Sequence, residues 1–230
     1  MLSVVIPAYN EEKTIRVILN KVLDVDIEKE VIVINDGSTD STRKIVEEYY
    51  SERVKLINKE NGGKASAVRS GIENAKGDYV IIQDADLEYD PENYPELIEP
   101  LLNGQAEAVY GDRFPLGRKN MFFKQIIANK FLTFLTNFLF KGSIRDMETC
   151  YKVIPLGLLR TLDLKEENFD IEAEISAKLL KRNVNIVNVP IRYKGRSYEE
   201  GKKIGIKDAF SAICVLLKYK YSKNNYNIKL

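Results

Sequence analysis

Two acidic side chains spaced two residues apart, Asp84 and Asp86, follow directly after the short apolar run 79–82. The run predicts a buried strand, and the two acids then lie where that strand ends. Neighbouring carboxylates repel each other, and their burial without a partner is costly. A hard cation such as Mg²⁺ or Mn²⁺ relieves both costs, because it is held by one or two carboxylates together with substrate phosphates. An acidic turn before the helix that follows Pro91 explains the same pattern, so the pair alone does not distinguish a metal site from such a turn.

The composition narrows the chemistry that is available. The 230 residues include no histidine, which excludes His-based acid/base catalysis, Ser-His-Asp triads and most zinc sites. Cys150 and Cys214 form neither a metal-spaced pair nor a disulfide framework, which is typical of a reducing compartment. The formal net charge of +1 does not favour nucleic acid as a partner. Catalysis is therefore expected to use carboxylates, Lys, Arg, Tyr or a metal ion.

Apolar runs and helical periodicities alternate along the first half of the chain. Strands are predicted at 2–6, 31–34, 54–57, 79–82 and 106–111. Helices are predicted between them, and Asn10 is expected to cap the first helix. The alternation predicts one α/β domain with a mostly parallel central sheet and helices on both faces.

Polar clusters follow the predicted strands, and ligands of such sheets bind beyond the carboxyl ends of the strands. The clusters are 7–11, 36–38, 61–64, 84–88 and 111–113. Taken singly, each can be explained as a helix cap, a turn or a flexible connection. The chain has no Gly-x-Gly-x-x-Gly after its first strand and no Walker A pattern. The convergence of five clusters on one edge is what indicates a binding site.

The chain resembles the family 2 inverting glycosyltransferases of the GT-A fold. Within them it is most similar to the branch of dolichyl-phosphate mannose synthase and other polyprenyl-phosphate glycosyltransferases. The resemblance covers almost the whole chain and rests on the stretches 5–11, 35–40, 61–64, 77–87, 111–113 and 146–152, which are specific together and mostly weak singly. It implies transfer of a hexose, with inversion, from a nucleoside diphosphate sugar, with GDP-mannose and UDP-glucose as leading donors.

The resemblance also implies roles on the donor side. The implied ligands of Mg²⁺ or Mn²⁺ are Asp84, Asp86 and Glu88, and the metal would bridge the donor diphosphate and stabilise the leaving nucleoside diphosphate. Glu88 stands where a mannose synthase typically has Gln. The implied nucleotide-sugar residues are Pro7, Ala8, Tyr9, Glu11, Asp36, Gly63, Lys64, Asp84 and Ala85.

On the acceptor side, Asp146 matches the acid of the family's Asp-x-x-Thr-Gly-Tyr-Lys-like motif, in which Cys150 here replaces Gly. A sugar or protein hydroxyl needs a general base, and Asp146 is then the candidate. A polyprenyl phosphate is already an anion, and Asp146 would then position the donor sugar or basic side chains. Asp86, Arg113 and Asp146 are the implied catalytic residues. The implied ligands of the acceptor phosphate are Arg113, Arg118, Arg196, Lys202 and Lys203, of which the last three lie on a basic loop at 192–203.

Two apolar segments are the candidates for contact with the lipid. In 121–140 apolar residues recur at helical spacing, which predicts either a core helix on the sheet or an amphipathic helix at the bilayer or the prenyl chain. A second apolar helix is expected at 204–221, with a tip of aromatic residues and lysines. No apolar run reaches the ~20 residues that span a bilayer, and because Met1 leads directly into the first predicted strand, no signal peptide is expected.

These patterns lead to one expected organisation. A glycosyltransferase domain is expected at 1–203, with the donor half at 1–111 and the acceptor half at 112–203, followed by an amphipathic helix and basic tail at 204–230. The enzyme is expected to be cytoplasmic and peripheral at the inner face of the cell membrane, by direct contact or through a membrane-anchored partner. A non-catalytic nucleotide-sugar-binding scaffold is the alternative of another class, and the presence of Asp84, Asp86 and Asp146 argues against it.

Overall fold

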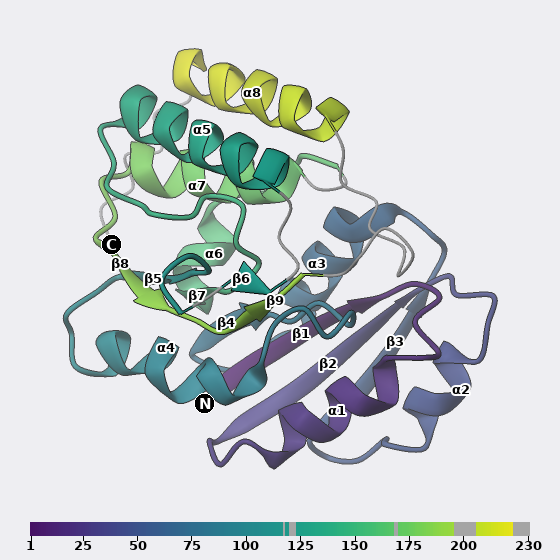
Figure 1. The fold of residues 1–230 in the computed structure, drawn as a ribbon. Helices are drawn as coiled ribbons and strands as arrows, with labels where there is room; N and C mark the ends of the chain where they lie inside the picture. The colour runs from purple at the N-terminus through teal and green to yellow at the C-terminus, as the bar shows by residue number, and fades with distance from the viewer. Residues whose placement is uncertain (117, 120–122, 168–169, 196–205, 223–230) are drawn as a thin grey trace.

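A central sheet of seven strands organises the protein in the computed structural model, which describes the chain except residues 117, 120–122, 168–169, 196–205 and 223–230 (Figure 1). The side chains of 118, 119, 206 and 207 are also outside the description. The strand order is β3-β2-β1-β4-β7-β5-β8. The strands are β1 (Leu2–Ala8), β2 (Lys29–Asp36), β3 (Val54–Lys59), β4 (Tyr79–Ile82), β5 (Ala108–Asp112), β7 (Lys152–Pro155) and β8 (Ile186–Pro190).

One strand runs against the others. β1 to β4 are parallel to one another, and β5 is parallel to β8. β7 lies between β4 and β5 and is antiparallel to both. β1 and β2 lie within the sheet, and their apolar runs are almost wholly buried, as expected for strands covered on both faces. A separate two-stranded ladder pairs β6 (Arg118–Lys119) with β9 (Tyr193–Lys194).

Helices cover both faces of the sheet (Figure 1). On one side lie α1 (Ile15–Asp24), α2 (Thr42–Glu47), η1 (Pro91–Asn93) and α4 (Tyr94–Leu102), and on the other lie α3 (Gly63–Asn74) and α6 (Leu156–Thr161). Small residues let α3 lie directly on the sheet. A Cβ on Gly71 would come within 2.2 Å of the Val5 side chain, so a larger residue there would force α3 off β1.

Three further helices stack beside one another at one end of the molecule (Figure 1). They are α5 (Phe123–Phe140), α7 (Ile171–Lys181) and α8 (Ile206–Tyr221). Every residue of α7 from Ile171 to Leu180 is buried, and α5 packs against both α7 and α8. Within the described part of the chain, no helix is both long and apolar enough to cross a membrane.

The five strands expected from the sequence are all present, with ends that differ by up to two residues, whereas β6 to β9 were not predicted. The expectation that Asn10 caps the first helix is wrong. α1 begins at Ile15, and Asn10 has a left-handed backbone with φ 56°. Its side-chain oxygen accepts a hydrogen bond from the backbone N–H of Thr39 at 2.8 Å. Asn10 therefore ties the loop after β1 to the loop after β2, a long-range contact that replaces a local cap.

Candidate active site

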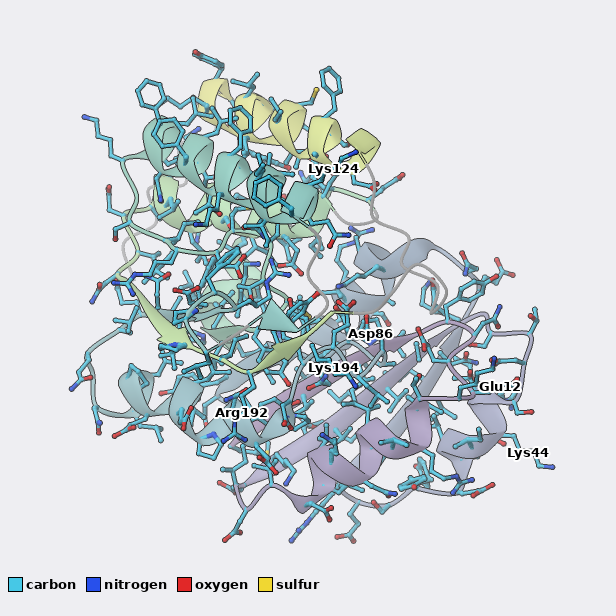
Figure 2. All side chains as sticks on the ribbon, in the orientation of Figure 1. Glu12, Lys44, Asp86, Lys124, Arg192 and Lys194 are labelled. Carbon is cyan, nitrogen blue, oxygen red and sulfur yellow. The ribbon has the colours of Figure 1, made fainter. Side chains whose placement is uncertain are left out.

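The direction of β7 brings the candidate residues together. β4 and β5 end at the same edge of the sheet, and because β7 is antiparallel to both, the segment that precedes β7 reaches that edge too. The Cys150 thiol lies 3.2 Å from the carbonyl oxygen of Ile82, and the N–H of Gly111 donates to the carbonyl of Tyr151 at 2.8 Å. The loop with Asp84 and Asp86, the turn with Arg113 and the segment with Asp146 are therefore neighbours. In Figure 2 Asp86 lies between the sheet and the α5–α8 layer.

The loop after β1 carries the first group of predicted donor residues. Pro7 and Ala8 are the last residues of β1, and Ala8 is buried. Tyr9 is 42% exposed. The Glu11 carboxylate accepts a hydrogen bond from the Thr14 hydroxyl at 2.6 Å at the start of α1.

Asp36 and Gly63 are in direct contact. Asp36 is buried, and its two carboxylate oxygens accept hydrogen bonds from the N–H groups of Gly62 (3.0 Å) and Gly63 (2.9 Å). Lys59 donates to the same carboxylate at 2.6 Å. Gly63 has φ 80°, a left-handed conformation that glycine adopts without strain. Asp36 thus anchors the N-terminus of α3, where an acidic group is favoured by the helix dipole.

Lys64, the next residue of α3, forms an ion pair with the first aspartate of the Asp-x-Asp sequence. Its ammonium lies 2.7 Å from one carboxylate oxygen of Asp84 and 2.9 Å from the other. Desolvation opposes the charged form of Lys64, but the Asp84 carboxylate outweighs it, so the pKa of Lys64 is raised. Ala85 between the two aspartates is buried. Asp86 accepts a hydrogen bond from the N–H of Glu88 at 3.1 Å, which shapes the turn.

Among the described residues, no three acids, cysteines or histidines are arranged to hold a metal ion. Glu88, the third predicted ligand, accepts a hydrogen bond from the Tyr193 hydroxyl at 2.6 Å. Mg²⁺ and Mn²⁺ need only one or two carboxylates when substrate phosphates complete the coordination. Asp84 and Asp86 fit that requirement for a metal that arrives with a diphosphate.

A buried ion pair joins Arg113 to Asp146. Asp146 is fully buried, and Arg113 donates to both of its carboxylate oxygens, from Nε at 2.6 Å and from Nη2 at 2.8 Å. The backbone N–H of Arg113 and the side-chain amide of Asn129 also donate to this carboxylate. Burial works against the charge on Arg113, but Asp146 outweighs it and the pKa of Arg113 is raised. A carboxylate enclosed in this way is suited to positioning Arg113 and is poorly placed to take a proton from a substrate.

Asn129 was not among the predicted site residues. It lies on the buried side of α5 with Leu132, Thr133 and Thr136. That side also fixes the segment before β7, because the Thr133 hydroxyl accepts from the N–H of Met147, and Asn137 exchanges two hydrogen bonds with the backbone of Ile144. The signal in the sequence is the polar stripe itself, whose spacing of three and four residues marks one helical face.

The remaining predicted acceptor residues are described only in part. The backbone of Arg118 pairs with that of Tyr193 in the small β6–β9 ladder, and the Arg113 guanidinium lies over the Tyr193 ring at 5.1 Å. Arg196, Lys202 and Lys203 lie outside the described residues. Cys150 is a small buried side chain, and burial raises the pKa of its thiol well above the ordinary value, so it is not a ready nucleophile.

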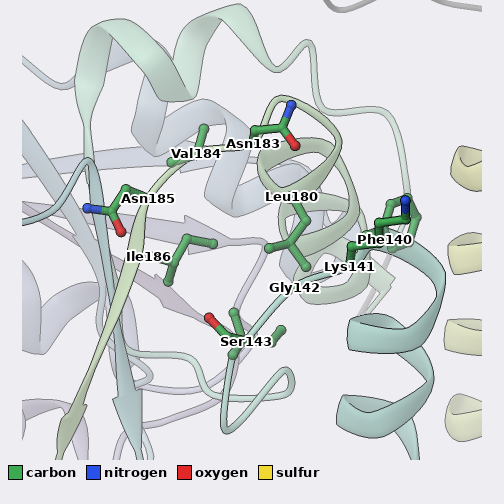
Figure 3. Close-up of a pocket in the computed structure, with 10 residues that line it drawn as sticks. Phe140, Lys141, Gly142, Ser143, Leu180, Asn183, Val184, Asn185 and Ile186 are labelled. Atoms are coloured by element: carbon green, nitrogen blue, oxygen red, sulfur yellow. The ribbon is translucent and has the colours of Figure 1, made fainter.

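A pocket of about 200 Å³ lies elsewhere (Figure 3). It is bordered by the end of α5, the end of α7 and the start of β8, with Phe140, Leu180 and Ile186 in its lining. Because β8 is parallel to β5, its start belongs to the opposite edge of the sheet from Asp84 and Arg113. This pocket is therefore separate from the candidate active site.

Comparison with known proteins identifies the family. The model of the family described as glycosyl transferase family 2 matches residues 3–162. An uncharacterized protein of Methanocaldococcus jannaschii is 34% identical over 221 residues, which cover 87% of this chain and 93% of that protein. The UDP-N-acetylglucosamine–dolichyl-phosphate N-acetylglucosaminyltransferase of Methanococcus voltae is 26% identical, with 97% of each chain covered. A dolichol-phosphate mannosyltransferase of Pyrococcus furiosus is 30% identical, with 88% of this chain and 60% of that protein covered.

A solved structure shows the same fold. Glucosyl-3-phosphoglycerate synthase from Mycobacterium tuberculosis, in complex with Mn²⁺, UDP and phosphoglyceric acid, superposes with a TM-score of 0.76 at 20% identity, over 98% of this chain and 80% of that one. The predicted GT-A-like α/β fold with a mostly parallel sheet is confirmed. The match over 3–162 and the named relatives show that this chain is a glycosyltransferase and belongs to glycosyl transferase family 2.

Proposed function

We propose that the protein transfers a hexose from a nucleoside diphosphate sugar to a polyprenyl phosphate at the inner face of the cell membrane. Residues 1–111 would bind the donor and 112–203 the acceptor, followed by a C-terminal helix and basic tail at 204–230. The observation that carries the proposal is the orientation of α5, whose polar side holds the Arg113–Asp146 pair through Asn129 while its opposite side exposes a row of large apolar residues.

The exposed row runs along the whole helix. It consists of Phe123, Ile127, Phe131, Phe134 and Phe138, which are 52–75% exposed. Phe210, Leu217 and Tyr221 of the adjacent α8 are exposed as well, and we call these eight residues the apolar face. In Figure 2 aromatic side chains project outward from α5 and α8. An exposed apolar area of this kind is unusual on a soluble monomer and is typical of a membrane or protein contact.

The charge around the apolar face favours a lipid surface. α5 contains no acidic residue. Among the side chains that the structure describes, the exposed lysines on the two helices and just beyond them are Lys124, Lys130, Lys141, Lys218 and Lys220. Cationic side chains that border an apolar helix face attract anionic headgroups while the rings enter the layer beneath. An amphipathic lipid substrate would reach the protein from that layer.

The Arg113–Asp146 pair supports an anionic acceptor. A hydroxyl acceptor requires a general base, and Asp146, the candidate for that role, is enclosed by four hydrogen-bond donors. A phosphate acceptor needs no base and instead needs an oriented cation. Arg113 is held in one orientation by its bidentate pair and by the Tyr193 ring, and the backbone of Arg118 pairs with that of Tyr193 in the small β6–β9 ladder. Arg196, Lys202 and Lys203 would complete the acceptor site.

The donor side is supported by the loops at the sheet edge and by the relatives. Pro7, Ala8, Tyr9, Glu11 and Asp36 would hold the nucleoside, and Gly63, Lys64, Asp84 and Ala85 the diphosphate. A divalent metal, Mg²⁺ or Mn²⁺, would be held by Asp84 and Asp86 with Glu88 nearby, and would supply Lewis-acid stabilisation of the leaving diphosphate. Structures of glucosyl-3-phosphoglycerate synthase contain Mn²⁺ with UDP or UDP-glucose. The names of two relatives include dolichyl or dolichol phosphate.

The test is a transfer assay with the full chain, a short prenyl phosphate and a panel of GDP- and UDP-hexoses, with and without Mg²⁺ or Mn²⁺. The expected result is metal-dependent formation of a glycosylated prenyl phosphate from one donor. Arg113→Ala should abolish transfer. Transfer to a sugar or peptide hydroxyl with none to the prenyl phosphate would refute the lipid acceptor. Binding of a sugar nucleotide with neither transfer nor hydrolysis would support the scaffold hypothesis instead.

A further inference from the structure

Glu148 is a carboxyl group in the centre of the site to which the proposed function gives no role. It lies in the segment that precedes β7, two residues after Asp146, and is half-buried. Within the described part of the chain its carboxyl group has no hydrogen bond and no ion pair, although Asp146 and Glu172 near it are both paired. A half-buried carboxyl group without a partner is unusual, because desolvation is then uncompensated.

The charges around Glu148 come from three elements. They are Arg113 after β5, Asp146 and Lys152 on the segment into β7, and Glu172 on α7. Desolvation is the largest effect on Glu148, and together with Glu172 and Asp146 it outweighs the two cations, so the pKa of Glu148 is raised to about 7. Near neutral pH the group is then protonated in part of the molecules, and it can both donate and accept hydrogen bonds.

Two buried polar atoms beside Glu148 also lack partners. They are the Thr149 hydroxyl oxygen and one carboxylate oxygen of Glu172. Lys152 joins these residues, because its ammonium donates to the Thr149 carbonyl and to the other carboxylate oxygen of Glu172. Unsatisfied buried polar groups are rare in folded proteins and call for an explanation such as a ligand. Glu148, Thr149 and Glu172 therefore form one cluster in which each side chain can still make a hydrogen bond to a ligand.

The segment that carries Glu148 and Thr149 joins the two ends of the proposed reaction, because Asp146 pairs with Arg113 and the Cys150 thiol lies 3.2 Å from the carbonyl oxygen of Ile82, two residues before Asp84. On one side the charges of Arg113 and Asp146, at the acceptor end, act on Glu148. On the other side the charge of Glu172 acts on Lys64, which is paired with Asp84 at the diphosphate end. A sugar that leaves a diphosphate near Asp84 for an acceptor near Arg113 must pass through the space between them.

The chemistry of the cluster fits a sugar better than a phosphate or a metal. Asp146 is neutralised by Arg113 and Glu172 by Lys152, which leaves Glu148 as the unbalanced group. An unpaired carboxylate repels a phosphate, and the described residues hold no set of three metal-ligating acids. Hydroxyl groups of a sugar supply both donors and acceptors at neutral charge. We propose that the Glu148 carboxyl group contacts the transferred hexose and selects the donor by hydrogen bonds to the hydroxyl groups of that sugar.

This inference rests on the proposed function, and the test separates the two. The affinity of the full chain is measured by calorimetry in Mn²⁺ for UDP, UDP-glucose, UDP-N-acetylglucosamine, GDP and GDP-mannose. For the donor that the wild-type protein prefers, Glu148→Ala should weaken sugar-nucleotide binding by about 10-fold, as for one or two lost hydrogen bonds, and leave the matching nucleoside diphosphate within about twofold. Glu148→Gln, which keeps an acceptor and a donor, should restore part of the loss.

Glu96→Ala, which removes an exposed acid from α4, is the control and should change neither affinity. Equal weakening of nucleotide and sugar nucleotide by Glu148→Ala would overturn the proposal, because it would indicate a structural effect. Unchanged affinities with lost transfer would overturn it in favour of a base that acts on the acceptor. If Glu148→Ala does not fold, the Gln variant alone carries the comparison, and an unchanged preference among donors refutes the proposal. Wild-type protein that binds no sugar nucleotide refutes the proposed function and this inference with it.

Discussion

The apolar face makes a quantitative prediction about membrane binding. Phe134 and Phe138 are 65% and 72% exposed, and their rings stack on each other along the outer side of α5. Complete burial of a Phe side chain contributes about 1.5–3 kcal/mol, so insertion of the exposed two-thirds of each ring contributes about 1–2 kcal/mol. The double substitution Phe134→Ser with Phe138→Ser should therefore weaken binding to anionic vesicles by about 30- to 700-fold.

Sedimentation with vesicles of anionic and of neutral lipid measures this change. The matched control is Tyr50→Ser, since Tyr50 is also 72% exposed but follows α2, away from α5 and α8. The double variant should keep its free energy of unfolding, because neither ring is buried in the free protein. It should also keep its affinity for nucleoside diphosphates. Unchanged sedimentation of the double variant, or an equal loss in Tyr50→Ser, would refute the membrane role of the apolar face.

Three further predictions concern the interior of the site. Asp146→Ala leaves Arg113 buried without its partner and should lower the free energy of unfolding, measured by urea titration, by about 3–5 kcal/mol. The control is Glu92→Ala, which removes the exposed Arg192–Glu92 pair and should lower it by less than about 1 kcal/mol. Similar losses in the two variants would contradict the enclosed Arg113–Asp146 pair. Between pH 4.5, the ordinary pKa of Glu, and about 7, the pKa of folded Glu148, the folded state holds more protons than the unfolded state, so stability should decline as pH rises through this range. Glu148→Gln should remove that part of the decline in thermal melts, and an unchanged slope would show that the pKa is not raised. Asp86→Asn should remove the increase in nucleoside diphosphate affinity on addition of Mn²⁺, about 10-fold or more in calorimetry, and a persistent increase would exclude Asp86 as a ligand.

Asp146 shows how much of the role of a single residue can be predicted from the sequence. Its motif marks it as part of the site, but the same acid is compatible with a general base or with a positioning group. The choice depends on which donors surround the carboxylate. Those donors are Arg113, which follows β5, and Asn129, which lies on α5, and neither is close to Asp146 in the chain. The pairing also means that variants of Arg113 and Asp146 disturb one unit, so comparing the two variants alone does not separate the acceptor hypotheses.

The segment 121–140 shows the same limit for a whole helix. Its sequence predicts a helix, yet apolar residues occur on more than one side of it, so periodicity leaves the buried side open. In the structure the stripe of Asn129, Thr133 and Thr136 faces inward. Asn129 and Thr133 form hydrogen bonds with the segment before β7 and with each other. The large aromatic residues are thereby turned outward, against the usual expectation for an isolated amphipathic helix.

The sequence by itself determined the parallel half of the fold and the position of Asp84 and Asp86 directly after a buried strand. Strand periodicity is local, and the polar clusters after successive parallel strands must meet at one edge for reasons of topology. Only the tertiary structure decided which residues face Asp84 and Asp86 across the site. That depends on β7, a four-residue strand inserted antiparallel between β4 and β5. β7 pairs with residues that lie more than forty positions away in the sequence, and four residues contain no local signal of the direction in which the strand will run.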